Sequence, residues 1–251
     1  SDTPGANNSR TQVYLEKHGY PGTVYPVNPR RETVHGVKCY PSVADIPEPV
    51  DHAFITTPPA IVPQVIRQCG EAGVTVATVF TSDFAESGAE GAKLQEELIQ
   101  AAKQGGVRLI GPNCMGVYNT DPPAPIAPNT VLQLPELIKG NVGVISHSGS
   151  LTGTFISRGQ ARGLGFSKIV SIGNESDISV AEIGEILVDD PKTEAILLFL
   201  ETIRSADAFA AMARRAYEKG KPVIAYKLGR SEAAQEFTAS HTGAIAGTDS
   251  A

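Results

Sequence analysis

The sequence predicts an α/β protein with parallel sheets, arranged as two successive modules. Strand-sized apolar segments alternate with helix-length amphipathic segments, which is the pattern of βαβ units. A proline-rich stretch at 121–135 interrupts this alternation, which then restarts. The 251 residues are enough for one large domain or two small ones, each with its own core.

The first module is expected to alternate helices and strands up to residue 110. The expected helices cover 11–19, 61–72 and 89–104, and the expected strands cover 23–27, 53–56, 74–81 and 107–110. Gly105 and Gly106 should end the third helix, because glycine readily takes the left-handed conformation found after a helix.

The second module repeats the alternation after the proline-rich stretch. Its expected strands cover 142–146, 169–172, 195–200 and 222–226, and its expected helices cover 150–162, 180–189 and 206–219. We expect a doubly wound sheet in each module. The domains are predicted at 1–120 and 141–251, with 121–140 as an irregular connection, because proline disfavours regular structure.

The composition excludes several classes of protein. The chain carries 21 Lys and Arg against 27 Asp and Glu and has no basic stripe, which disfavours nucleic-acid binding. No apolar run reaches the roughly 18 residues of a membrane helix. Three cysteines without C-x-x-C spacing or a secretory leader disfavour disulfides and zinc. We therefore expect a cytoplasmic protein without a metal site, a membrane anchor or a nucleic-acid partner.

Clusters of Gly, Pro, Ser, His and Asn follow the predicted strands. They lie at 57–59, 81–83, 111–114, 146–149, 173–175 and 201–202. In open parallel sheets, ligands bind beyond the carboxyl ends of the strands. Turn formation alone also enriches glycine and proline, so the clusters indicate a site without defining its reaction.

The segment SHSGSLT at 146–152 joins a predicted strand to a predicted helix. Free main-chain N–H groups and hydroxyls at a helix start suit a phosphate or a carboxylate, although an ordinary serine N-cap explains the pattern equally well. A serine hydrolase is excluded, because the Gly-x-Ser-x-Gly spacing is absent around Ser148.

The segment SHTGAIAG at 240–247 places His241 among small residues that allow close approach. Imidazole is a competent nucleophile at neutral pH. Glu201, at the end of a predicted strand, could accept a hydrogen bond from one ring nitrogen and leave the other free to attack. Taken alone, a loop histidine is more often inert, and Glu201 could be a solvated residue at a strand end.

Six stretches carry a resemblance that runs in order over almost the whole chain. They are 20–29 (YPGTVYPVNP), 40–47, 106–116 (GVRLIGPNCMG), 141–151 (NVGVISHSGSL), 193–201 and 240–247 (SHTGAIAG). In them the chain resembles the α-subunit portion of the NDP-forming acyl-CoA synthetases, the group of succinyl-CoA synthetase and ADP-forming acetyl-CoA synthetase. Ser240 replaces the glycine of succinyl-CoA synthetases, so SHTG looks more like the acetyl-CoA synthetase branch.

The resemblance implies a Rossmann-like CoA-binding domain, lacking its first strand, followed by a flavodoxin-like domain. It implies that His241 is the phosphorylated histidine, that Glu201 holds it, and that Ser148, Gly149 and Ser150 bind the phosphate near the acyl phosphate. The implied CoA contacts are Ser1, Thr3, Pro4, Gly5, Arg31, Thr57, Pro58, Pro59, Asn113 and Cys114. Cys114 is expected to have no catalytic role, and His147 is expected to be a wall residue.

The implied reaction joins an acid to CoA with ATP, giving acyl-CoA, ADP and phosphate through acyl phosphate and phosphohistidine. The chain shows no Gly-x-x-x-x-Gly-Lys-[Ser/Thr] loop. The resemblance therefore implies that ATP, ADP and Mg²⁺ bind in an ATP-grasp domain or β subunit. The other expected partners are a small carboxylic acid and further copies in an oligomer.

The sequence leaves two alternative functions open. An NAD(P)-binding Rossmann oxidoreductase would share the first fold, but Gly-x-Gly-x-x-Gly is not visible. A non-catalytic CoA-binding regulatory module would need neither His241 nor Glu201, and both are present. The sequence leaves open which acid is used and whether the nucleotide is ATP or GTP.

Overall fold

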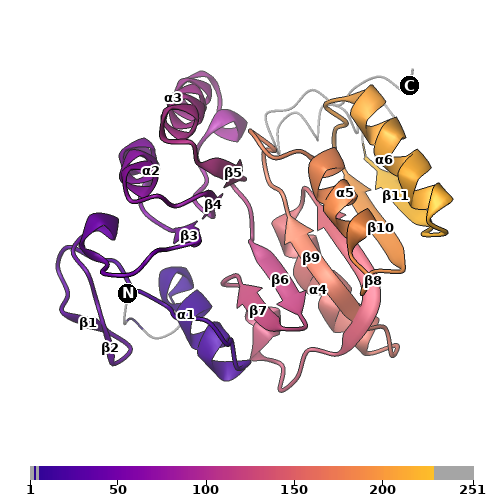
Figure 1. Cartoon of the computed structure of the whole chain (residues 1–251), viewed down its shortest axis with the longest axis horizontal. Helices are drawn as coiled ribbons and strands as arrows, with labels where there is room; N and C mark the ends of the chain where they lie inside the picture. The colour runs from indigo at the N-terminus through magenta and orange to yellow at the C-terminus, as the bar shows by residue number, and fades with distance from the viewer. Residues whose placement is uncertain (1–2, 4–5, 229–251) are drawn as a thin grey trace.

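The computed structural model describes Thr3 and residues 6–228, and shows two α/β halves (Figure 1). The first half holds a three-stranded parallel sheet in the order β3-β4-β5. Its strands are β3 (His52–Ile55), β4 (Val76–Val79) and β5 (Arg108–Ile110), connected by the helices α2 (Val62–Glu71) and α3 (Ala89–Gly105). A small hairpin, β1 (Thr33–Val34) with β2 (Val37–Lys38), lies to one side.

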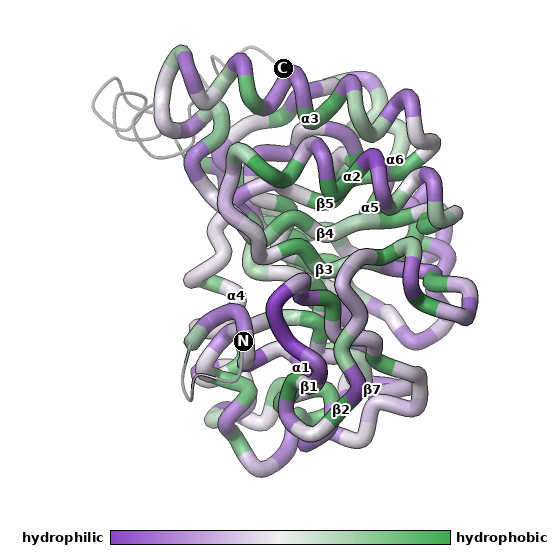
Figure 2. Tube along the Cα trace, turned by 90° about the vertical axis from the view of Figure 1, so that its left-hand side faces the viewer, coloured by the Kyte–Doolittle hydropathy of each residue, from purple (hydrophilic) through white to green (hydrophobic). Residues whose placement is uncertain are grey.

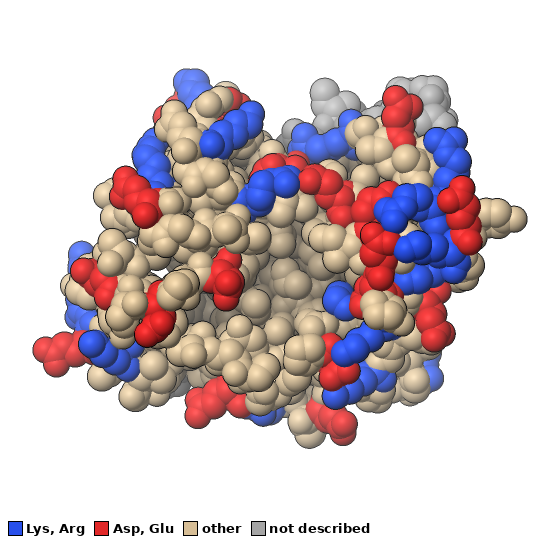
Figure 3. Space-filling view, in the orientation of Figure 1, with Lys and Arg blue, Asp and Glu red and all other residues tan. Residues whose placement is uncertain are grey.

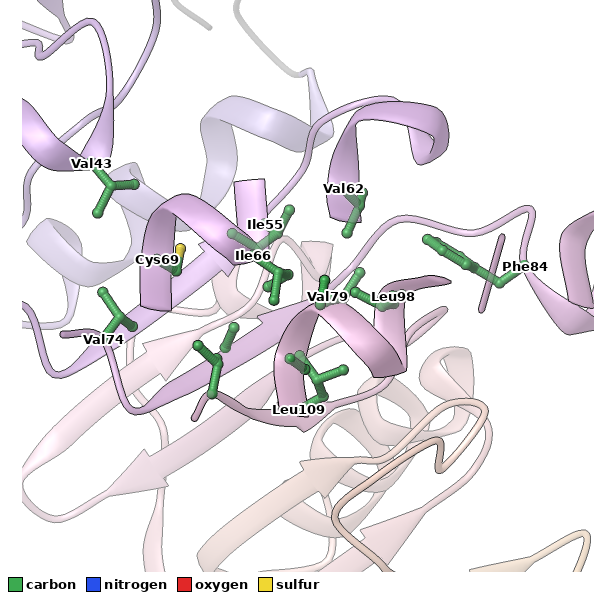
Figure 4. Packing of buried hydrophobic residues seen from close by; sticks show 14 residues of the cluster. Val43, Ile55, Val62, Ile66, Cys69, Val74, Val79, Phe84, Leu98 and Leu109 are labelled. Atoms are coloured by element: carbon green, nitrogen blue, oxygen red, sulfur yellow. The ribbon is translucent and has the colours of Figure 1, made fainter. Parts of the chain in front are cut away.

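The core of the first half lies between this sheet and its two helices. Ile55, Ile66, Val79, Leu98 and Leu109 are among its buried side chains (Figure 4). The strands are largely hydrophobic in Figure 2, as expected for a sheet covered by helices. Gly106 ends α3 with φ 67°, which confirms the predicted glycine stop.

The second half holds a six-stranded sheet in the order β11-β10-β8-β9-β6-β7. Its parallel part comprises β8 (Lys139–Ser146), β9 (Phe166–Ser171), β10 (Ala195–Leu200) and β11 (Val223–Lys227). The helices are α4 (Gly149–Gln160), α5 (Val180–Asp189) and α6 (Ala206–Glu218).

Alternate side chains of β8 enter two different cores. Ile145 packs with residues of α5 and α6, whereas Val144 packs with Ile156 of α4 and Tyr14 of α1 (Asn7–Lys17). Successive side chains of a strand point to opposite faces, so helices cover both faces of this sheet. The predicted α/β fold with parallel, doubly wound sheets is confirmed for this half.

The segment expected to be an irregular connection is partly regular. Strand β6 (Val117–Thr120) turns back into β7 (Pro123–Ile126), and the pair adds an antiparallel edge to the second sheet. Because β7 pairs with β6 alone, its two prolines are tolerated, since an edge strand has N–H groups that need no partner strand. The domain division at 121–140 stays a prediction.

Two other expectations differ from the structure. The predicted strand 23–27 is reduced to a single bridge between Val27 and Tyr40, because Pro26 has no N–H to donate to a ladder. The first helix packs against β7 of the second sheet, with Tyr14 buried there and Lys17 Nζ donating to the carbonyl of Gln133 at 2.6 Å. A helix at the start of the sequence therefore completes the second core.

Charged groups join the two halves on the surface. Arg108 of β5 forms ion pairs with Asp177 at 3.0 Å and with Glu182 of α5 at 2.8 Å, and Asp177 also accepts from the main-chain N–H of Leu109. Figure 3 shows a face that is hollowed between the halves, with acidic and basic side chains interspersed around the hollow. None of the helices in the described part of the chain has the length and apolar character that a bilayer crossing requires.

Candidate functional site

A cavity of about 670 Å³ lies between the halves, beyond the carboxyl ends of β3, β4, β8 and β9. The lining residues are Asn8, Thr56, Thr57, Pro58, Phe80, Thr81, Ser82, Asn113, Cys114, Met115, His147, Ser148, Gly149, Ser150 and Gly173. None of these described residues is Asp, Glu, Lys or Arg. The cavity therefore has polar walls without a carboxylate, ammonium or guanidinium group.

The cavity brings together seven of the residues predicted for the site. They are Thr57, Pro58, Asn113, Cys114, Ser148, Gly149 and Ser150. Pro59 and Arg31 do not line it: Pro59 begins a 3₁₀ turn, and Arg31 is exposed next to β1. Thr3 also lies outside the lining, and its carbonyl accepts from Ser9 Oγ at 3.1 Å. Ser1, Pro4, Gly5 and His241 lie outside the described residues.

Helix α4 starts at the cavity without a side-chain cap. Its N-cap residue Ser148 has extended backbone angles, and its Oγ lies 3.3 Å from Ser150 Oγ. The serines that begin α5 and α6 behave differently, because Ser179 and Ser205 each accept a hydrogen bond from a main-chain N–H of their helix. The first turn of α4 thus keeps uncapped N–H groups beside the cavity, which suits an anion.

Cys114 belongs to the loop that follows β5 and lines the cavity. The thiol is only 2% exposed and donates to the carbonyl of Val79 at 3.3 Å. Burial raises the pKa of this thiol to about 12, so it stays protonated at neutral pH. This protonation state agrees with the expectation that Cys114 is not a nucleophile.

The loop after β5 touches the loop after β9 through Asn113 and Asn174. Asn113 adopts φ +55° and its Nδ2 lies 3.3 Å from Asn174 Oδ1. Asn174 Nδ2 in turn donates to Glu86 Oε2 and to Gln95 Oε1 of the first half. The carboxyl ends of the two sheets are therefore held together at the cavity by side-chain amides.

Gly173 makes this contact possible, and its replacement is expected to destabilise the protein. It has φ +58°, and a Cβ there would meet the carbonyls of Pro112 and Asn113, the second at 2.6 Å. Gly173→Ala should lower the free energy of unfolding by about 2 to 4 kcal/mol, from left-handed strain plus overpacking. Gly220→Ala introduces the same left-handed strain without a steric clash, because Gly220 has φ +68° and open space around it. Chemical denaturation of both variants therefore separates the cost of the strain from the cost of overpacking. Equal losses in the two variants would contradict the steric argument.

Glu201 is buried at the end of β10, 4% exposed, and does not line the cavity itself. Its main-chain N–H donates to Nδ1 of His147 at 3.1 Å, and His147 does line the cavity. Oε2 of Glu201 is buried and has no hydrogen-bond partner among the described residues. A buried carboxylate oxygen without a partner is suited to accept a hydrogen bond from a ligand or from another segment of the chain.

Two polar groups near Glu201 lie in contact: His147, which was expected to be a wall residue and lines the cavity, and Glu175, for which the sequence predicted no role. Nε2 of His147 lies 3.1 Å from Oε2 of Glu175, and both side chains are 3% exposed. Glu175 has φ +51°, and its Oε1 accepts from the N–H of Val180 at 2.7 Å. The only signal in the sequence was that both residues follow predicted strands. Within the described residues, no group of His, Cys, Asp and Glu side chains could hold a metal ion.

Two family models match the chain. A CoA binding domain covers residues 1–120, and a succinyl-CoA ligase-like flavodoxin domain covers residues 139–251. The α subunit of the ADP-forming acetate–CoA ligase II of Pyrococcus furiosus is 42% identical over 227 residues, 90% of this chain and 48% of that protein. The ADP-forming 4-hydroxybutyrate–CoA ligase of Nitrosopumilus maritimus is 34% identical over 92% of this chain and 33% of its own length.

A solved structure agrees with these relatives. The dinucleotide-forming acetyl-coenzyme A synthetase 1 of Ca. Korarchaeum cryptofilum, in complex with phosphate and ADP, superposes with a TM-score of 0.91 at 36% identity, covering 98% of this chain and 52% of that one. The chain thus spans between a third and about half of the length of the relatives named here. It belongs to the family of NDP-forming acyl-CoA synthetases, as the counterpart of their α subunit or α portion.

Proposed function

We propose that this chain is the acyl-transferring part of an ADP-forming acyl-CoA synthetase. The observation that carries the proposal is the cavity, which joins strand ends of the CoA-binding half to the uncapped start of α4 in the other half. Such a cavity can hold a thioester and a phosphate side by side. The matched CoA binding domain favours CoA over a nicotinamide nucleotide as the ligand of the first half.

The proposed first step takes place between acyl-CoA and phosphate. The uncharged lining suits the neutral thioester, and the hydroxyls of Ser148 and Ser150 with the first turn of α4 suit the phosphate. A phosphate oxygen attacks the thioester carbonyl and the C–S bond breaks. The products are acyl phosphate and CoA, whose sulfur takes up a proton. The protein acts mainly by positioning the reactants and by stabilising charge.

The proposed second step transfers the phosphoryl group to His241. A ring nitrogen attacks phosphorus, the bond between phosphorus and the acyl oxygen breaks, and the acid leaves as a carboxylate. We assign Glu201 to the other ring nitrogen, because its buried Oε2 has no hydrogen-bond partner in the part of the chain that the structure describes. A carboxylate in this position orients the ring and stabilises its positive charge.

The remaining parts of the reaction fall to a partner. ATP or ADP and Mg²⁺ would bind in an ATP-grasp domain or β subunit, with which phosphohistidine exchanges its phosphoryl group. The related synthetase solved with phosphate and ADP supports the use of a nucleotide. Use of a small carboxylic acid, assembly into an oligomer and location in the cytoplasm stay predictions. The three cysteines are free in the structure, which suits the reducing compartment expected for a cytoplasmic protein.

Labelling with phosphate tests the proposal. The full-length gene product, with its nucleotide-binding module, is incubated with acetyl-CoA and ³²P-labelled phosphate, and the labelled peptide is located under alkaline conditions that preserve phosphohistidine. We expect label on His241 that depends on acyl-CoA and that added ADP removes as ATP. Label on another residue, or tighter binding of NADH than of CoA in parallel titrations, would contradict the proposal.

A further inference from the structure

We propose that His147 and Glu175 are positioning residues, which fix the main chain of Glu201 and thereby aim its carboxylate. This inference rests on the proposed function, in which Glu201 holds His241. Neither residue is assigned to the chemical steps above. The proposal follows from the hydrogen bonds that link the ends of β8, β9 and β10.

Strand β8 pairs with β10 up to the point where Glu201 begins. These strands are parallel, with Ser146 opposite Phe199, and the N–H of His147 continues the ladder by donating to the carbonyl of Phe199 at 3.1 Å. The next bond of a parallel ladder would run from Glu201 N–H to the carbonyl of His147. The N–H of Glu201 instead donates to Nδ1 of the His147 side chain, at 3.1 Å. The imidazole thus extends the ladder just where the chain leaves β8 to begin α4.

Two hydrogen bonds fix the tautomer of His147. A main-chain N–H can only donate, so Nδ1 must be the unprotonated acceptor. The ring proton then sits on Nε2, which donates to Oε2 of Glu175 at 3.1 Å. Both ring nitrogens are occupied, so His147 has no nitrogen left for attack on phosphorus. A side chain with this pattern positions its neighbours.

Several contacts hold the side chain of Glu175 in place. Its backbone has φ +51°, a left-handed conformation that a non-glycine residue rarely adopts. Oε1 accepts from the N–H of Val180 at 2.7 Å, and Nε of Arg204 lies 3.6 Å from Oε2. Arg204 is itself tied to the carbonyl of Asn174 at 2.7 Å. A carboxylate buried to this degree needs such partners, and they hold it in one place.

These contacts form one chain of hydrogen bonds from α5 to the end of β10. It runs from Val180 N–H through Glu175 and His147 to Glu201 N–H. Two contacts fix the main chain that carries the carboxylate of Glu201. They are the hydrogen bond of its own N–H and the pairing of the preceding strand β10. An error of about 1 Å in the position of a catalytic group can reduce a rate 100-fold, so this chain should control phosphoryl transfer.

Glu175→Gln is the sharpest test, because it keeps the shape of the side chain. An amide has one oxygen and one NH₂, so its NH₂ must face either Nε2–H of His147 or N–H of Val180. One donor then meets another donor, and the hydrogen-bond chain breaks. We expect phosphorylation of His241 by acyl phosphate to slow by about 10- to 100-fold in rapid-quench experiments on the full-length protein. The affinity for CoA should change by less than about twofold, because the CoA-binding half is untouched.

Further variants separate positioning from general damage. His147→Asn places an amide oxygen where Nδ1 lies and should retain more activity than His147→Leu, which has no acceptor for Glu201 N–H. Glu194→Gln is the matched control, since its partner Asn141 is on the surface, and it should behave like wild type. Glu175→Gln should also slow phosphorylation less in a Glu201→Gln background than in wild type, because both act through one carboxylate.

The outcomes are distinct. A normal rate of His241 phosphorylation in Glu175→Gln, or equal rates in His147→Asn and His147→Leu, would overturn the positioning role while leaving the proposed function intact. Absence of label from His241 in the wild-type protein would overturn the proposed function and this inference together. If Glu175→Gln unfolds, the comparison of the two His147 variants decides alone.

Discussion

Replacement of His241 by alanine is expected to abolish phosphoryl transfer to the nucleotide while acyl phosphate still forms. The two half-reactions use different groups in the proposed mechanism, because phosphate attacks the thioester at the start of α4 and His241 acts only afterwards. Loss of a nucleophile typically costs about 10⁴- to 10⁶-fold in rate. We therefore expect no detectable ATP synthesis from acetyl-CoA, phosphate and ADP, together with acetyl phosphate that chromatography detects as a labelled product when ³²P-labelled phosphate is used.

The control variant is His35→Asn. His35 lies in the turn between β1 and β2 with φ +49°, a conformation that asparagine also tolerates, so this change removes a histidine without disturbing the backbone. It should retain full ATP synthesis. ATP formation by His241→Ala above about one thousandth of the wild-type rate would show that the phosphoryl group travels by another route. Absence of labelled acetyl phosphate would instead show that the two half-reactions are inseparable.

Long amphipathic helices and buried strands could be predicted from the sequence. Helix α5 occupies the predicted residues 180–189, and α3 ends at the predicted glycines. Both have a strong apolar periodicity and a clear local end signal, in Ser179 at the start of α5 and Gly106 after α3. The hairpin of β6 and β7 could not be predicted, because its prolines resemble those of a loop until the neighbouring strand β9 is known.

The residues of the candidate site likewise fall into those that the sequence could predict and those that it could not. Residues such as Thr57, Asn113 and Ser148 follow strands, so the rule for parallel sheets places each at the carboxyl edge of its own sheet, and the cavity between the two sheets contains all three. The pair of His147 and Glu175 depends on the register of β8 beside β9 and on the left-handed backbone of Glu175. Neither property is visible in local sequence. The role of His241 rests on its resemblance to the family, since the residue lies outside the described part of the chain.

An acidic residue at the start of α4 should separate folding from function. Ser148→Asp keeps a favourable residue type at the N-cap position, because aspartate and serine are about equally favourable there and the negative charge complements the helix dipole. The free energy of unfolding should stay within about 0.5 kcal/mol of wild type, or rise. The same charge repels the phosphate proposed to bind beside it. At 4 Å and an effective dielectric constant of 20, two unit charges repel by about 4 kcal/mol.

Partial exposure of Ser148 and screening by salt reduce this repulsion, so we expect the KM for phosphate to rise by about 100-fold. Steady-state kinetics at varied phosphate concentration measure the change, and added salt should partly restore affinity. Ser148→Asn has nearly the same shape without the charge and should raise KM far less. Ser179→Asp places an identical charge at the start of α5, away from the cavity lining, and should leave KM unchanged. Similar KM values for Ser148→Asp and Ser148→Asn would mean that phosphate binds elsewhere, because only a nearby anion can distinguish the two side chains by charge.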